Sequence, residues 1–204
     1  MPSIYHLKPA FQSVLRPVVR SLARAGVTPN QVTVAAVGVS FVAGAAIAWR
    51  PGETWPLVVL PAALVVRMAL NAVDGVLARE HGMTSRTGAV LNELGDVVSD
   101  AAMYLPLGLV DAVSAAWVVA AVVLGIVGEM AGVVAQVVGG ERRYDGPMGK
   151  SDRALAFGLV SVALAAGVRR TRVFDGVLAV VCVLLVVTIV NRARRARAAV
   201  GGGR

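Results

Sequence analysis

Six long apolar runs, separated by short polar stretches, decide what this chain can fold into. They lie at residues 30–49, 55–78, 87–110, 113–138, 153–168 and 173–191. A hydrocarbon core about 30 Å thick needs roughly 20 mostly apolar residues per spanning helix, and 57% of the 204 residues are hydrophobic. The pattern predicts an all-α integral membrane protein, a single domain over 1–204 whose six transmembrane helices form a bundle over 30–191.

The two ends of the chain carry a different pattern. Over residues 4–25, apolar side chains such as Leu7, Phe11 and Leu15 fall on one face of a helical wheel and basic side chains on the other. This predicts an amphipathic helix that lies in the membrane interface. Residues 192–204 are predicted to form a basic tail.

The net charge of +8 reflects topology rather than a nucleic-acid partner, and no nucleic-acid binding is predicted. Most basic residues fall in the N-terminal segment, the second and fourth interhelical loops and the tail, which share one side of a six-span protein. By the positive-inside rule, both termini are cytoplasmic and the protein lies in a bacterial-type inner membrane. Only the cluster at 169–172 runs against this rule.

The first span opens at Thr28-Pro29-Asn30-Gln31, a pattern typical of a helix N-terminus. Thr28 caps, Pro29 takes the first helical position, and Gln31 completes a capping box. Asn30 and Thr33 therefore lie where free backbone N–H groups favour phosphate. Capping alone would also explain these residues.

Polar residues interrupt the second and third spans. They are spaced three or four apart, so that each set lies along one helix face: Asn71, Asp74 and Ala78, then Asn92, Asp96 and Asp100. Acidic residues within spans are costly and usually functional. The short connection at 80–87 makes the two helices antiparallel, so we expect the polar faces to meet.

Oxygen donors from two facing helices, without His or Cys, predict a site for Mg²⁺ or Mn²⁺ that would hold a phosphate or pyrophosphate. Gly75 and Ala78 leave the helix surface bare beside Asp74, and Arg79 adds positive charge. The alternative is that these polar residues only hold the helices together, although Ser, Thr or single amides usually do this in membranes.

The spacing of these residues resembles a family signature. After Asp74-Gly75-x-x-Ala78-Arg79 come eight residues and then Gly88. Position 92 and Asp96 follow, with three residues between each of these positions. This closely resembles the signature of the CDP-alcohol phosphotransferase family. The similarity extends to the six spans, the amphipathic helix and the Pro29-Asn30-x-Val32-Thr33 start, and so covers most of the chain.

The resemblance implies an enzyme of phospholipid biosynthesis that moves a phosphatidyl-type group from a CDP-activated lipid, such as CDP-diacylglycerol, to an alcohol or polyol phosphate, with CMP as the leaving group. It implies four aspartates around two metal ions, a homodimer and a cavity open to the cytoplasm. By position, Asp74 matches a metal ligand and Asp96 a ligand and general base. The CDP-binding positions are Asn30, Thr33, Asp74, Gly75, Ala78, Arg79 and Gly88.

Two of the four signature aspartates are replaced, by Asn71 and Asn92. An amide offers a carbonyl oxygen without negative charge, so we expect weaker divalent binding, with one ion or two. Glu93 and Asp100 are possible compensations. The alternatives are a catalytically silent protein that binds CDP-lipid or other membrane lipids, and a hydrolase that uses water as acceptor. A transporter would show paired broken helices or repeated halves, which this sequence lacks.

Basic residues open the fifth span and close the sixth. Related enzymes that accept a phosphorylated polyol use basic residues at similar places, so Lys150, Arg153, Arg192 and Arg195 are candidates to hold the acceptor's phosphate. Topology and anionic lipid explain them equally well. Glu129 in the fourth span either pairs with Arg67 or lines the site.

Overall fold

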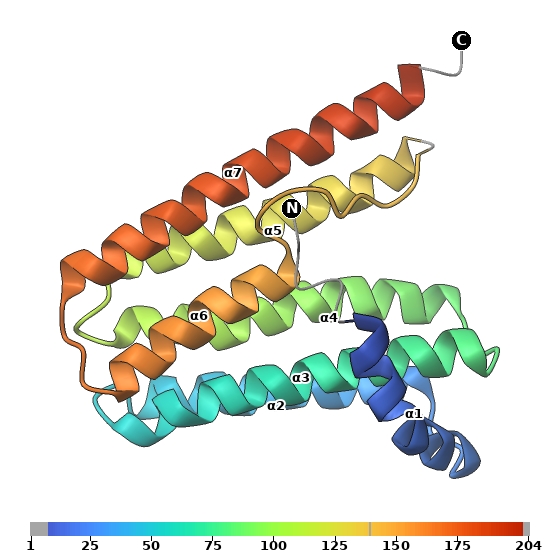
Figure 1. Ribbon diagram of the computed structural model, residues 1–204, viewed down its shortest axis with the longest axis horizontal. Coiled ribbons are helices and arrows are strands. Elements are labelled where there is room, and N and C mark those ends of the chain that lie inside the picture. Colours follow the sequence, from blue (N-terminus) through green and yellow to red (C-terminus); the bar gives the residue numbers. More distant parts are fainter. Residues whose placement is uncertain (1–7, 139, 202–204) are drawn as a thin grey trace. The chain divides into compact units, whose positions relative to one another are not determined.

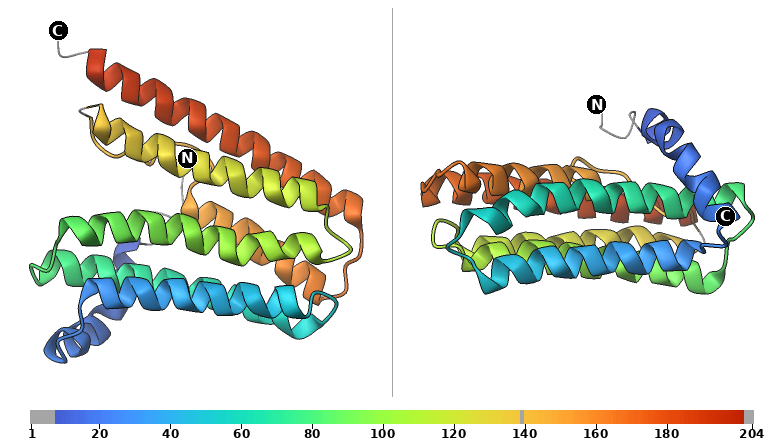
Figure 2. Two further views of the ribbon diagram at one scale, coloured as in Figure 1. Left: turned by 180° about the vertical axis from the view of Figure 1, so that it is seen from behind. Right: turned by 90° about the horizontal axis from the view of Figure 1, so that it is seen from below.

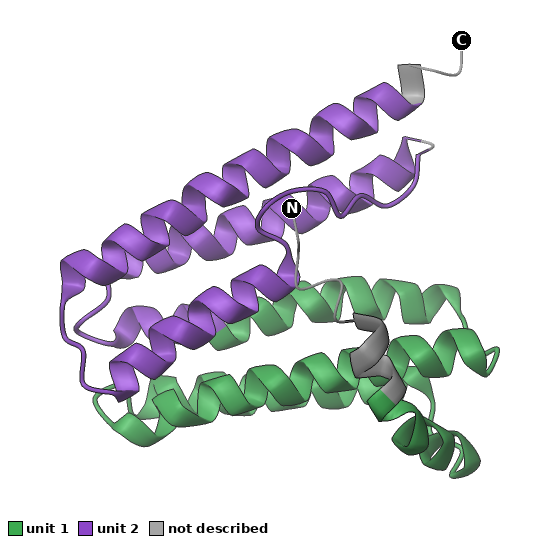
Figure 3. Ribbon diagram, in the orientation of Figure 1, with its two compact units in different colours: residues 1–103 green, residues 104–204 purple. Residues whose placement is uncertain are grey.

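The computed structural model describes residues 8–138 and 140–201, which form helices and connecting turns without a strand. The all-α prediction is confirmed. The chain divides into two compact units, residues 1–103 and 104–204 (Figure 3), and each is described by itself.

The first unit contains α1 (Lys8–Arg24), α2 (Pro29–Trp49), α3 (Thr54–Glu80) and most of α4 (Arg86–Tyr104). Helices α2 and α3 lie side by side and antiparallel (Figures 1 and 2). The predicted capping box at Thr28 is confirmed, since Thr28 accepts from the Gln31 N–H and donates its own N–H to the Gln31 side chain. Gly44 lets α2 approach α4, because a Cβ there would collide with the carbonyl oxygen of Ala102.

Helix α1 packs part of its apolar face against its own unit. Val19 is buried in a cluster with residues of α2 and α3, and Leu15 and Leu22 cover that cluster. Val14 and Val18 remain exposed. The predicted amphipathic segment began at residue 4, but residues 4–7 lie outside the described part. An interfacial position of α1 stays a prediction.

The second unit contains η2 (Leu105–Leu109), α5 (Ala115–Val137), α6 (Lys150–Ala165) and α7 (Thr171–Gly201). Helices α5 and α7 lie side by side (Figure 1). At the core the rings of Tyr104 and Phe157 stack with centroids 4.1 Å apart. Leu107, Leu164 and Leu185 of the same unit are fully buried.

Two helices end at other residues than the apolar runs that predicted them. The third apolar run is α-helical only to Tyr104 and continues as a 3-10 turn, because Pro106 lacks the N–H that an α-helix would use. Residues 192–201, predicted as part of a basic tail, extend α7 to Gly201. Alanine and arginine favour helix, which explains why the helix does not stop at Asn191.

Within the described residues, four helices are long and apolar enough to cross a membrane: α2, α3, α5 and α7. Helix α6 has 16 residues, and at 1.5 Å per residue it spans only about 24 Å. Helix α4 carries Glu93, Asp96 and Asp100, which lower its hydropathy. The count of six spans stays a prediction.

Candidate functional site

The polar faces of α3 and α4 meet, as the spacing of their residues predicted. The side-chain amide of Asn71 on α3 donates to Oδ1 of Asp96 on α4 over 3.1 Å. Both side chains are partly buried, and Asp96 keeps 18% of its side-chain surface exposed. The Asn71 amide thus orients the Asp96 carboxylate, which remains partly exposed.

The start of α2 joins the same site. The hydroxyl of Thr33 donates to Oδ2 of Asp74 over 2.8 Å, and this carboxylate is 5% exposed. Gly95 on α4 gives Thr33 its room, because a Cβ on that glycine would lie 3.4 Å from the threonine methyl group. Three helices therefore converge on the two signature carboxylates.

Arg67 of α3 was not predicted as a site residue, but its buried side chain contacts Asp96 and Asp100. Its Nη1 lies 2.5 Å from Oδ1 of Asp100, and its Nη2 donates to the backbone carbonyl of Asp96 over 2.9 Å. Nη2 is also 3.6 Å from the Asp96 carboxylate. Arg67 lies four residues before Asn71 and seven before Asp74, so its position on the polar face was a signal that could have placed it here.

The glycines of the signature allow close approaches. The Arg79 guanidinium folds back over Gly75, where a Cβ would lie 3.1 Å from Nη1. A Cβ on Gly88 would lie 2.8 Å from Oδ1 of Asn30 and 2.9 Å from the Ser85 hydroxyl. Gly88 thus lets the N-terminal end of α2 come close to that of α4, which brings together two of the residues predicted to bind CDP.

The remaining signature residues are half-buried. Ala78 lies on α3 one turn beyond Asp74, and Asn92 lies on α4 one turn before Asp96. Glu93 is also half-buried on α4, whereas Asp100 pairs with Arg67.

These donors fit a divalent cation. Mg²⁺ is usually held by one or two carboxylates together with substrate phosphates, and Asp74 and Asp96 with the amide oxygens of Asn71 and Asn92 provide such a set. Within the described residues, no three acidic, His or Cys side chains gather as metal ligands. This agrees with the loss of two carboxylates at positions 71 and 92.

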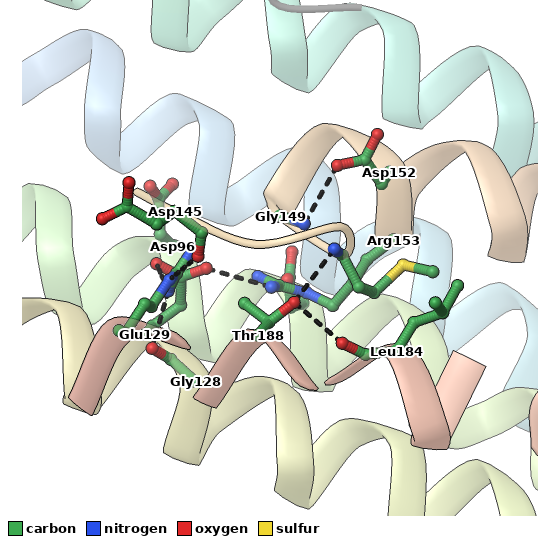
Figure 4. Close-up of polar contacts among 12 residues, drawn as sticks. Asp96, Gly128, Glu129, Asp145, Gly149, Asp152, Arg153, Leu184 and Thr188 are labelled. Atoms are coloured by element: carbon green, nitrogen blue, oxygen red, sulfur yellow. Dashed lines mark hydrogen bonds and ion pairs between the residues drawn. The ribbon is translucent and has the colours of Figure 1, made fainter. Parts of the chain in front are cut away.

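The second unit holds a charged cluster around Glu129 of α5 (Figure 4). Its carboxylate lies 3.0 Å from Arg153 of α6, 3.2 Å from Arg142 and 3.4 Å from Arg192 of α7. Nη1 of Arg192 also donates to the Gly128 carbonyl over 2.6 Å. Glu129 pairs with arginines of its own unit, and its predicted pairing with Arg67, which belongs to the other unit, stays a prediction.

Glycines on α5 make room for this cluster. A Cβ on Gly125 would lie 3.3 Å from the Arg153 side chain, and one on Gly132 would lie 2.6 Å from the carbonyl oxygen of Arg143. The spacing of Gly125, Gly128 and Gly132 along one helix face is the sequence feature that could have predicted this close packing against α5.

Two of the four predicted acceptor residues, Arg153 and Arg192, meet at Glu129. Arg195 is largely exposed and pairs with Asp145 at 2.8 Å, and the Asp145 carbonyl accepts from Nε of Arg192. Lys150 is the first residue of α6. Guanidinium groups suit phosphate recognition, and Arg153 and Arg192 are already positioned here by one carboxylate.

Comparisons with known proteins agree with this description. A protein-family model described as CDP-alcohol phosphatidyltransferase matches residues 26–190. The inner membrane protein YnbA of Escherichia coli is 41% identical over 192 residues, which cover 94% of this chain and 95% of that protein. A phosphatidylinositol phosphate synthase of Mycobacterium marinum is 38% identical over 97 residues, but the match spans only 39% of its length.

Solved structures show the same fold. The phosphatidylinositol phosphate synthase of Mycobacterium tuberculosis with CDP-DAG bound has a TM-score of 0.74 and 23% sequence identity, over 92% of this chain and 96% of that one. The same synthase in complex with manganese and citrate has a TM-score of 0.72.

Proposed function

This chain belongs to the CDP-alcohol phosphatidyltransferase family, and on that premise we propose that it transfers a phosphatidyl-type group from a CDP-activated lipid to an alcohol or polyol phosphate and releases CMP. The observation that carries this proposal is the meeting of signature residues from three helices, Asn71 with Asp96 and Thr33 with Asp74. Such a reaction is a step of phospholipid biosynthesis.

In this reaction the acceptor hydroxyl oxygen attacks the lipid-bearing phosphorus of the donor. The bond from that phosphorus to the oxygen bridging to CMP breaks, and CMP leaves with the electron pair. Asp96 takes the hydroxyl proton as general base, and the Asn71 amide and Arg67 keep its carboxylate oriented. Asn30, Thr33, Gly75, Ala78, Arg79 and Gly88 bind the CDP group.

A divalent cation, Mg²⁺ or Mn²⁺ as one ion or two, would be held by Asp74 and Asp96 with the amide oxygens of Asn71 and Asn92. It supplies positive charge for the donor's pyrophosphate. The manganese-containing structure of the mycobacterial synthase supports this assignment.

The acceptor's phosphate would bind to Lys150, Arg153, Arg192 and Arg195. The shared contact of the buried Arg153 and Arg192 with Glu129 supports this role for these two residues. Replacing Lys150 with Gln should raise KM for a phosphorylated acceptor and leave KM for the CDP-lipid unchanged. An unchanged acceptor KM would remove Lys150 from the site.

We further propose an inner-membrane protein with six spans, both termini in the cytoplasm, and a homodimeric assembly. The four long apolar helices and the inner-membrane relative support the membrane location.

Asn71 and Asn92 favour one alternative, a protein that binds CDP-lipid without turnover, because the site has fewer carboxylates. A second alternative, a hydrolase that transfers the phosphatidyl group to water, would use the same residues.

The experiment is to incubate the purified protein with CDP-diacylglycerol, a divalent cation and a panel of alcohols and polyol phosphates, and to measure CMP. We expect release that depends on one acceptor and is lost in Asp96→Asn. The matched control is Asp111→Asn, which changes an exposed aspartate and should retain activity. Release without any acceptor would indicate hydrolysis, and no release with CDP-lipid bound would indicate a silent binder.

A further inference from the structure

Glu129 of α5 joins two of the predicted acceptor residues, which lie far apart in the sequence. Glu129 is buried, and its Oε1 lies 3.0 Å from Nη1 of Arg153 on α6. Its Oε2 lies 3.4 Å from Nη1 of Arg192 on α7 and 3.2 Å from Arg142, which follows α5. The two oxygens of one carboxylate therefore contact guanidinium groups from separate parts of the chain.

Other groups limit where these two arginines can point. Nη1 of Arg192 donates to the Gly128 carbonyl over 2.6 Å, and its Nε donates to the Asp145 carbonyl over 3.2 Å. The Arg153 side chain lies against Gly125, where a Cβ would come within 3.3 Å of it. Both arginines are buried, so their guanidinium groups have little room to turn.

The orientation of a guanidinium group decides how well it binds phosphate. Its N–H groups form a rigid planar fork that can hold two phosphate oxygens at once. An arginine side chain that is not held in place loses much rotamer freedom when a ligand binds. A carboxylate that contacts both guanidinium groups removes part of this freedom before the ligand arrives.

We infer that Glu129 is a positioning residue of the acceptor site, which holds the guanidinium groups of Arg153 and Arg192 in the orientation that binds the acceptor's phosphate. Glu129 acts through these two arginines and is not a catalytic residue. Its side-chain length then matters as well as its charge. This inference rests on the proposed function, which assigns the two arginines to the acceptor.

The test is the variant Glu129→Asp, which keeps the charge and draws the carboxylate back by one methylene group. Calorimetric titration of the purified full-length protein in detergent gives the affinity for inorganic phosphate without a divalent cation, and for CDP-diacylglycerol with Mg²⁺. We expect the phosphate affinity to fall roughly 10- to 100-fold, since small misplacements of binding groups have effects up to this size. The affinity for CDP-diacylglycerol should stay the same.

The matched control is Glu141→Asp, the same change at an exposed position of the same unit. It should retain both affinities.

A second variant moves an arginine without altering Glu129. Gly125→Ala places a Cβ 3.3 Å from the Arg153 side chain, which then has to shift. Because alanine favours helix, α5 should remain folded. We expect weaker phosphate binding here too. Its control is Gly128→Ala on the same helix, whose Cβ would lie 3.7 Å from Ile189, at ordinary contact distance, and which should bind phosphate like the wild type.

Unchanged phosphate affinity in Glu129→Asp would overturn the inference. Equal losses of phosphate and CDP-diacylglycerol affinity would also overturn it, because they indicate a merely structural role. If Glu129→Asp does not fold, unchanged phosphate affinity in Gly125→Ala leads to the same conclusion, as does a wild type that binds no phosphate.

CMP release by the same wild-type preparation separates this inference from the proposed function. CMP release together with unchanged phosphate affinity in both variants would overturn only the inference. No CMP release with any acceptor would overturn the proposed transferase, even where the variants lose phosphate binding.

Discussion

Thr33 is the residue through which the first long helix acts on the candidate site. Its hydroxyl lies 2.8 Å from the Asp74 carboxylate, and a hydrogen bond to a charged group contributes about 1.5–3 kcal/mol. Thr33→Val keeps the shape and removes this bond. We expect kcat/KM for the CDP-lipid to fall roughly 10- to 100-fold, since 1.4 kcal/mol is a factor of ten.

The matched control for that prediction is Ser40→Ala on the same helix. Ser40 is also buried, and its hydroxyl donates to the Ala36 carbonyl within α2. The control should retain kcat/KM. Equal losses in both variants would mean that Thr33 acts only through the packing of α2.

At the level of single residues, sequence spacing predicted part of the arrangement. It placed Asn71 and Asp96 on facing helices, and these side chains do meet. The same spacing puts Arg67 on the polar face of α3. Its choice of Asp100 and the Asp96 carbonyl as partners depends on the register between α3 and α4, which spacing along one helix does not give.

The packing of α2 against α4 depends on one glycine. A Cβ on Gly44 would collide with the Ala102 carbonyl, whereas a Cβ on Gly38 would meet nothing within 4 Å. Both Gly→Ala changes gain about 0.5–1 kcal/mol of helix propensity. Only Gly44→Ala adds overpacking, which costs about 1–3 kcal/mol.

We therefore expect Gly44→Ala to lower the melting temperature in detergent, and Gly38→Ala to leave it unchanged or raise it. Equal melting temperatures would show that α2 and α4 do not pack as closely as described.

Helices α5, α6 and α7 are tied together by Glu129. Breaking a buried ion pair by removing one partner costs about 3–5 kcal/mol. Glu129→Gln leaves Arg142, Arg153 and Arg192 facing one another. We expect a much lower melting temperature, partly restored by sulfate or phosphate.

The control for this prediction is Glu53→Gln, because Glu53 forms an exposed pair with Arg50. Surface pairs contribute little, so its melting temperature should hardly change. A Glu129→Gln variant as stable as the wild type would contradict the structural role of the cluster.

At the level of helices, hydropathy located every element but not every end. The capping box gave the start of α2 correctly, because its hydrogen bonds are local. The end of α4 depended on Pro106, and the end of α7 on helix-forming residues that follow the apolar run. An apolar run indicates which part of a helix can contact lipid, but it does not show at which residue the helix ends.

For the whole molecule, the arrangement across the membrane is a prediction that cysteine labelling can test. Cys182 is buried and should be replaced by Ser, so that single cysteines can be placed in the loops. We expect Thr84→Cys and Glu141→Cys to react from the cytoplasmic side, and Gly52→Cys and Asp111→Cys from the other.

All four of these positions are exposed. Labelling of Thr84→Cys and Glu141→Cys from opposite sides would contradict six spans. Labelling of Thr84→Cys and Asp111→Cys from the same side would show that α4 with η2 does not cross.

The overall class of the molecule followed from the sequence because membrane spans depend on composition and length. The second charged cluster did not, because Glu129, Arg153 and Arg192 come from three different helices. Their meeting depends on the glycines of α5, whose effect appears only once the helices are packed.

The central claim is that the chain transfers a phosphatidyl-type group, and mass spectrometry of the lipid product tests it most directly. The protein is incubated with CDP-diacylglycerol, Mn²⁺ and the acceptor panel. We predict one new lipid that carries both the diacylglycerol phosphate of the donor and an acceptor, formed together with CMP and absent with Asp96→Asn. Phosphatidic acid as the sole lipid product, or no product from any acceptor while CDP-lipid is bound, would contradict the claim.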